Sequence, residues 1–226
     1  MIREIILDTE TTGLDPKTDR LVEIGCLELV NRYPTGREFH TYLNPERDVS
    51  EHATKIHGLT TSFLIDKPSF GSIASEFITF IAHDPLIIHN APFDVGFLNA
   101  ELARGSFQPL EMTRVTCSLQ LARRKHPAGP NSLDALCKRY QIDATKRTKH
   151  GALLDCQLLA DVYVELLGIR QAAFDMPMTA SDEDTHHHAT AAQRPYPLSS
   201  RLSEEDEAAH LEFIKTLGEK ALWLRA

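Results

Sequence analysis

The chain has 226 residues and a formal net charge of −8, with 42% hydrophobic and 25% charged residues, which allows one ordinary domain with a sizeable core plus an appendage. The negative charge argues against binding nucleic acid by bulk electrostatics alone, although a local basic face or bound metal ions would reverse the sign of a site. The four cysteines are scattered and form no CxxC pair, which predicts reduced thiols. The N-terminus carries charges early, and no apolar run approaches the ~18 residues of a membrane helix. We therefore expect a cytoplasmic protein with no membrane contact.

The first part of the chain predicts three β-strands. Residues 2–8 contain an unbroken apolar run, which is typical of a buried central strand. Two further strands are expected at residues 20–32 and 36–44, joined by a turn around Pro34, Thr35 and Gly36.

After residue 68 the pattern changes to helices that alternate with short strands. Helical spacing of apolar residues predicts a helix over residues 75–84, with Pro68 and Ser69 as start signals, and Asn131 is expected to cap a later helix. The other helices are expected at residues 92–105, 132–142 and 151–167, and the other strands at 85–90 and 111–117. Strands followed by alternating helices and strands predict an α/β fold, with helices flanking a mixed sheet.

The composition changes near residue 168. Residues 168–202 are rich in Pro, Ser, Thr, Ala and acids and predict a flexible linker, in which the histidines at 186–188 are interpreted as a solvated tract. Residues 203–217 predict a short amphipathic helix that opens with Ser203 and acids. Because such a helix cannot form its own core, and the single Trp follows it, residues 203–226 are predicted to dock on a partner.

Four acidic residues occupy unusual positions. Asp8 and Glu10 stand at the end of the first apolar strand, and Asp94 and Asp155 stand near the starts of two predicted helices. Each could be explained singly, by a surface turn or by the helix dipole. Together they could converge at one edge of the sheet, where four carboxylates would need cations to offset their repulsion and loss of water.

Oxygen ligands of this kind suit two Mg²⁺ or Mn²⁺ ions, a pair that serves in-line phosphoryl displacement. His150 lies five residues before Asp155 and supplies a group that can take a proton from an attacking water.

Three motifs now resemble those of a known family. The segments DTETTGL (8–14), HNAPFDVGFL (89–98) and HGALLDC (150–156) are similar, in order and spacing, to the motifs of the DEDDh 3′–5′ exonucleases. Together with HATKIHGLT (52–60), they resemble most closely a subgroup, the epsilon (proofreading) subunits of bacterial DNA polymerase III. The resemblance implies a ribonuclease H-like exonuclease domain over residues 1–167.

The resemblance also implies roles for individual residues. Asp8, Glu10, Asp94 and Asp155 would hold the two metal ions, and His150 would be the general base. The residues expected to contact the 3′ end of the substrate strand are Thr9, Gly13, Leu14, His57, Asn90 and Phe93. For His57 a polar loop histidine is the alternative, and His89 is interpreted as structural.

A basic run precedes His150. Its members could be solvated helix faces or could steer phosphates into the site. They are Arg114, Arg123, Arg124, Lys125, Lys138, Arg139, Lys146, Arg147 and Lys149.

The resemblance implies that the single-stranded 3′ end of DNA is the substrate, that the polymerase alpha subunit binds residues 203–226, and that a sliding clamp contacts Gln171–Phe174. Two alternatives remain open: a stand-alone exonuclease that trims DNA or RNA, and a non-catalytic scaffold of the polymerase assembly. A docking tail argues against the first, and retention of the acids and His150 argues against the second.

Overall fold

The computed structural model describes residues 2–145, 147–168 and 203–216. The chain divides into two compact units, Met1–Met178 and Thr179–Ala226. The first unit contains a five-stranded sheet in the order β3-β2-β1-β4-β5, made of β1 (Arg3–Thr11), β2 (Leu21–Val30), β3 (Tyr33–Tyr42), β4 (Leu86–Ile88) and β5 (Val115–Cys117). Strands β1 to β3 pair antiparallel, whereas β4 is parallel to both β1 and β5. The expected mixed sheet is therefore confirmed.

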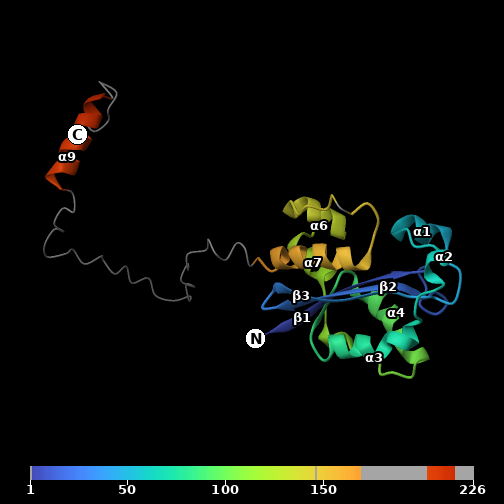
Figure 1. Ribbon diagram of the computed structural model, residues 1–226. Helices are drawn as coiled ribbons and strands as arrows, with labels where there is room; N and C mark the ends of the chain where they lie inside the picture. The colour runs from blue at the N-terminus through green and yellow to red at the C-terminus, as the bar shows by residue number, and fades with distance from the viewer. Residues whose placement is uncertain (1, 146, 169–202, 217–226) are drawn as a thin grey trace. The chain divides into compact units, whose positions relative to one another are not determined.

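Helices cover both faces of this sheet (Figure 1). On β1, Ile5 and Leu7 point into the core that contains α3 and α4, while Ile6 between them points into the core that contains α6 and α7. Burial on both faces explains why this strand is a continuous apolar run. The helices of this unit are α1 (Glu51–His57), α2 (Thr61–Leu64), α3 (Phe70–Ile81), α4 (Ala91–Arg104), α5 (Ser118–Lys125), α6 (Leu133–Tyr140) and α7 (Ala152–Leu166), with a 3₁₀ turn at Met112–Arg114.

The turn predicted around Pro34 and Gly36 is wrong. Strands β2 and β3 are joined by a two-residue loop, Asn31 and Arg32, because Val30 pairs with Tyr33. Both loop residues have positive φ, 50° and 72°, as in the two-residue turns that match the twist of a hairpin. Pro34 and Gly36 lie inside β3, next to the irregularity in its pairing between Leu27 and Leu29 of β2.

The predicted cap of α6 is off by one residue. Ser132 is the N-cap, and its hydroxyl accepts a hydrogen bond from the backbone N–H of Ala135. Asn131 instead donates from Nδ2 to the carbonyls of His126 and Gly129, and so braces the preceding loop. Helices α1, α2 and α5 had no counterpart among the sequence predictions.

In the second unit, the helix predicted over residues 203–217 is present as α9 (Glu204–Thr216). Ser203 and Asp206 exchange hydrogen bonds at its start, as in a capping box. Leu211 and Phe213 on this helix are exposed.

No helix among the described residues is long and apolar enough to cross a membrane. Several predictions concern residues outside the described part of the chain. These residues include the predicted clamp contact, the histidine tract, nearly all of the predicted linker and residues 217–226.

Candidate active site

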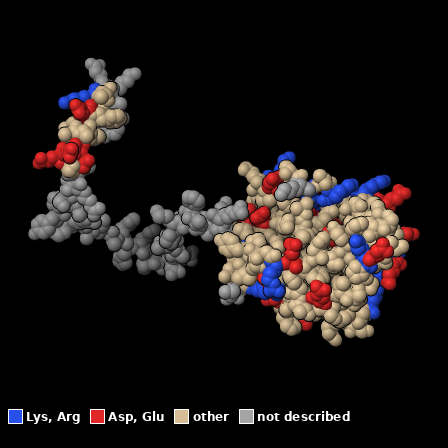
Figure 2. Space-filling model, viewed as in Figure 1, with Lys and Arg blue, Asp and Glu red and all other residues tan. Residues whose placement is uncertain are grey.

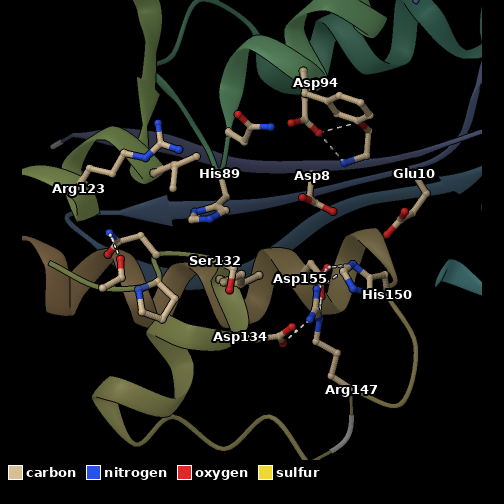
Figure 3. Close-up of a pocket in the computed structure, with 18 residues that line it drawn as sticks. Asp8, Glu10, His89, Asp94, Arg123, Ser132, Asp134, Arg147, His150 and Asp155 are labelled. Atoms are coloured by element: carbon tan, nitrogen blue, oxygen red, sulfur yellow. Dashed lines mark hydrogen bonds and ion pairs between the residues drawn. The ribbon is translucent and has the colours of Figure 1, made fainter. Parts of the chain in front are cut away.

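Three elements bring the four acids together at the end of β1. Asp8 and Glu10 are two residues apart on the strand, so their side chains leave the same face. Asp94 arrives on the first turn of α4, because β4 runs parallel to β1 and leads directly into that helix. Asp155 arrives on the first turn of α7. Figure 3 shows Asp94 approaching from one side and Asp155 from the other, with Asp8 and Glu10 between them.

Close packing of α7 on β2 sets the position of Asp155. A Cβ atom on Gly25 would lie 2.5 Å from the carbonyl carbon of Ala152, so only glycine permits this approach. The thiol of Cys156 donates to the carbonyl of Gly25 at 3.2 Å and ties the same turn to the strand. Gly25 is therefore a structural requirement of the site, although it lies outside the three motifs.

Thr9 fixes Asp94. Its backbone N–H and its hydroxyl both donate to Oδ1 of Asp94, at 3.1 and 2.8 Å. The strand end thus orients a carboxylate that belongs to a helix 85 residues further along the chain.

His150 completes the cluster. One ligand atom from each of Glu10, His150 and Asp155 lies within 4.8 Å of the other two. The backbone N–H of His150 donates to the carbonyl of Ile56 and so holds the loop before α7 against α1. The acids and His150 line a cavity of about 770 Å³.

The acids are crowded enough to perturb one another. Burial, followed by the charges of Asp94, Asp155 and Glu10, raises the pKa of Asp8 well above its ordinary value. Burial and the charge of Asp155 raise the pKa of Glu10 to about 8. Burial raises the pKa of Asp94 to about 7 despite its hydrogen bonds from Thr9. Each of these carboxylates lacks a sufficient counter-charge, which is the condition under which a carboxylate cluster binds cations.

The predicted substrate residues divide into two groups. Thr9, Asn90 and Phe93 line the cavity, whereas Gly13, Leu14 and His57 do not. His57 is buried, with Nε2 3.3 Å from the carbonyl oxygen of Thr11 and Nδ1 accepting from the backbone N–H of Leu59 at 3.0 Å.

Gly13 and Leu14 belong to the turn after β1. A Cβ atom on Gly13 would lie 2.4 Å from the carboxylate of Asp19, which braces this turn through the hydroxyl of Thr12. Leu14 is 76% exposed.

Four of the eight described members of the basic run donate to backbone carbonyls, namely Arg114, Lys125, Arg139 and Lys149. Of the same eight members, only Arg123 and Arg147 line the cavity. Arg114 donates to the carbonyls of Ile81 and Asp84, and Lys125 donates to the carbonyls of Glu165 and Leu166.

Sequence reasoning missed several cavity residues. Asp134 lies in the first turn of α6. No sequence pattern indicated it as a site residue, because its partner Arg147 lies 13 residues away across a loop. His89 was interpreted as structural, and its Nδ1 does lie within hydrogen-bond distance of the hydroxyl of Ser118, at 2.9 Å. It also lines the cavity, which the sequence did not indicate. Figure 3 places His89 and Arg123 beyond the carboxylates, toward the other end of the cavity.

The donor set fits hard divalent cations. Four carboxylates and one imidazole offer mostly oxygen ligands, and Asp8 has no ion pair or side-chain hydrogen bond with the described residues. Softer metals prefer thiolates, and no cysteine lines the cavity among the described residues. The chemistry of the donors therefore fits divalent metal ions.

The raised pKa of Glu10 predicts a pH-dependent stability. Between its ordinary value of 4.5 and its folded value of about 8, the folded protein keeps a proton that the unfolded chain has released. Stability in EDTA therefore falls as the pH rises through this interval. Glu10→Gln removes this contribution, so its melting temperature in EDTA should exceed that of the wild type by several degrees at about pH 8.5, and by less at about pH 6.

Calorimetry at a series of pH values checks this expectation. Glu76→Gln is the matched control, because Glu76 is exposed on α3 and distant in sequence from every acid of the site. A Glu10→Gln variant whose melting temperature follows that of the wild type at every pH would contradict it.

Comparison with known proteins agrees with the site. Residues 5–163 match the exonuclease family, RNase_T. The chain is 54% identical over 224 residues to DNA polymerase III subunit epsilon of Rickettsia felis, covering 96% of this chain and 97% of that protein. It is 42% identical over 237 residues to the subunit of the same name from Escherichia coli, covering 98% of this chain and 97% of that protein.

Solved structures show the same fold. Exonuclease X in complex with 5′ overhanging duplex DNA is 25% identical, with a TM-score of 0.59, over 74% of this chain and 93% of that chain. Exonuclease I, at 18% identity and a TM-score of 0.67, covers 76% of this chain and 42% of that chain and shows the fold alone. The chain belongs to the exonuclease family, together with the epsilon subunits of bacterial DNA polymerase III.

Proposed function

We propose that this protein is a 3′–5′ exodeoxyribonuclease that removes mismatched 3′-terminal nucleotides as the proofreading subunit of a replicative DNA polymerase in the cytoplasm. The observation that carries the proposal is the convergence of Glu10, His150 and Asp155 within 4.8 Å, in a cavity that Asp8 and Asp94 also line. The choice of DNA and of a polymerase assembly is supported by the names of the relatives, which cover nearly the whole chain.

Asp8, Glu10, Asp94 and Asp155 would hold two divalent cations, Mg²⁺ or Mn²⁺. Such ions would polarise the scissile phosphodiester and lower the pKa of the attacking water. His150 would accept the proton of that water; its side chain is 45% exposed, and it lines the cavity together with Asp155. Thr9 keeps Asp94 aimed at the cluster through its two hydrogen bonds.

The cavity suits the end of a single strand. Its volume of about 770 Å³ is in the range of sites for small ligands, so it would admit few nucleotides. Phe93 offers an aromatic ring to a base, and Asn90 and Thr9 offer polar groups to the terminal nucleotide. Contacts from Gly13, Leu14 and His57 would require a substrate that extends past the cavity toward the turn after β1.

Charged side chains of both signs lie on the face of the first unit that Figure 2 shows. Arg123 lines the cavity and would be a phosphate contact there.

Residues 203–226 would bind the polymerase alpha subunit. Support comes from α9, which exposes Leu211 and Phe213 at 55% and 61%, and from relatives that are named as subunits. The proposed sliding-clamp contact at Gln171–Phe174 rests on the sequence resemblance alone.

A 3′-end-labelled hydrolysis assay tests the function. With Mg²⁺ we expect release of the labelled 3′-terminal nucleotide from a DNA strand, faster at a mismatched end than at a paired end, and no release in excess EDTA. A chain lacking residues 203–226 should hydrolyse free oligonucleotides at the same rate but lose co-elution with the polymerase alpha subunit.

The alternatives predict other results. Preferential shortening of an RNA strand would indicate an RNA-trimming enzyme, and an inactive protein that still bound polymerase would indicate a scaffold. A truncated chain that still co-eluted with polymerase would show that the docking segment lies elsewhere.

A further inference from the structure

Arg147 joins three polar groups of the site. Its Nε and Nη2 donate to the two carboxylate oxygens of Asp155 at 2.5 and 2.6 Å, Nη2 also donates to Nδ1 of His150 at 2.9 Å, and Nη1 donates to Asp134 at 2.5 Å. The Arg147 side chain is only 7% exposed, and Figure 3 shows it beside Asp155 and His150. A buried, forked contact of this kind is geometrically specific and stronger than a surface ion pair.

The first consequence concerns Asp155. Both of its oxygens are engaged by the guanidinium, and its side chain is only 4% exposed. A divalent cation at this carboxylate would share its oxygens with the guanidinium of Arg147, and two positive charges held by one buried carboxylate repel each other. Arg147 and a cation therefore compete for Asp155.

The second consequence concerns His150. A guanidinium can only donate, so Nδ1 of His150 is the acceptor in this contact. In a neutral imidazole the other nitrogen, Nε2, then carries the proton. With one nitrogen engaged and the other already protonated, His150 in this arrangement cannot take a proton from water.

A second arrangement lies close by. Nδ1 of His150 is 3.6 Å from Oδ2 of Asp155, so it could donate to that oxygen once the guanidinium has withdrawn. Nε2 would then present its lone pair to the cavity. Asp134 is 67% exposed and already binds Nη1 of Arg147. Arg147 could therefore keep this ion pair after it leaves Asp155.

We propose that Arg147 is a positioning residue that holds Asp155 and His150 in a restrained arrangement, and that a divalent cation must displace it from Asp155 before His150 can act as a base. This inference rests on the proposed function, because it requires cation binding at Asp155. It assigns Arg147 a role that the three motifs do not include.

Calorimetric titration of the full chain with Mn²⁺ tests the competition. Arg147→Met, which removes both the charge and the donors, should bind the first Mn²⁺ about 10-fold more tightly than the wild type, or better, since a charge-assisted hydrogen bond no longer opposes binding. Arg147→Lys keeps the charge without the fork and should lie between the two, and it serves if the Met variant fails to fold. Arg20→Gln is the matched control, because Arg20 forks to the buried Glu101 outside the cavity.

Nitrogen NMR of the His150 ring, assigned with a His150→Gln variant, gives a second measurement. In EDTA the wild type should show protonated Nε2 and accepting Nδ1, and this preference should be lost in Arg147→Met. Equal or weaker Mn²⁺ affinity in Arg147→Met and Arg147→Lys would overturn the inference while leaving the proposed function intact. A wild-type chain that bound no Mn²⁺ would overturn both.

Discussion

Asp8→Asn is expected to abolish hydrolysis and to raise the melting temperature in EDTA, whereas Asp155→Asn is expected to abolish hydrolysis and to lower it. If these carboxylates hold catalytic cations as proposed, the loss of either should reduce the rate by about 10³-fold or more, because such ions contribute several kcal/mol to the stabilisation of the transition state. The two variants therefore share one effect and differ in the other.

The difference in stability follows from their partners. Asp8 has no ion pair with the described residues, and burial and three neighbouring carboxylates raise its pKa well above the ordinary value. A neutral amide there relieves repulsion. Asp155 instead pairs with Arg147 through both oxygens, and its removal leaves a nearly buried guanidinium with Asp134 as its remaining carboxylate partner. We expect a loss of about 2–4 kcal/mol in the free energy of unfolding.

Hydrolysis of a labelled DNA strand and thermal unfolding in EDTA measure these two effects. Asp66→Asn is the control, since Asp66 is exposed after α2 and lies outside the cavity. Measurable turnover at the wild-type rate in either variant would remove that residue from the metal ligands. A lower melting temperature for Asp8→Asn would show that its charge is compensated in the folded protein.

His150→Ala is expected to reduce the rate at saturating Mn²⁺ by about 10²–10⁴-fold, the range for loss of a general base. The physical reason is position: His150 stands beside Asp155 with its ring partly exposed to the cavity, within 4.8 Å of ligand atoms of Glu10 and Asp155. The four carboxylates remain in this variant, so cation binding should persist.

Single-turnover hydrolysis with Mn²⁺ in excess separates these effects. His52→Ala is the matched control, because His52 is exposed on α1 and lies outside the cavity. A rate within about threefold of the wild type would exclude His150 as the base. Full activity regained only at much higher Mn²⁺ concentration would assign it to metal binding instead.

Much of the architecture could be predicted from local pattern. The apolar run at residues 5–7 predicted a buried central strand, and α3 and α7 followed from helical spacing. The hairpin turn was misplaced because Pro34 and Gly36 are strong turn residues, whereas Asn31 and Arg32 adopt positive φ to match strand twist. Pairing between β2 and β3 decided that position, and pairing is a nonlocal property.

The sequence by itself determined the kinds of chemistry available: an acidic pair on one face of a strand, two helix-start acids, a histidine five residues before the last of them, and the family to which these belong. Only the tertiary structure decided which charges meet. Four of the eight described members of the basic run donate to backbone carbonyls. Arg147 alone among the described members forks onto Asp155. The reason is that residue spacing determines which residues are neighbours only within a single helix or strand. Contacts between elements depend on how the sheet and the loop before α7 pack. The close approach of α7 to Gly25 is one example.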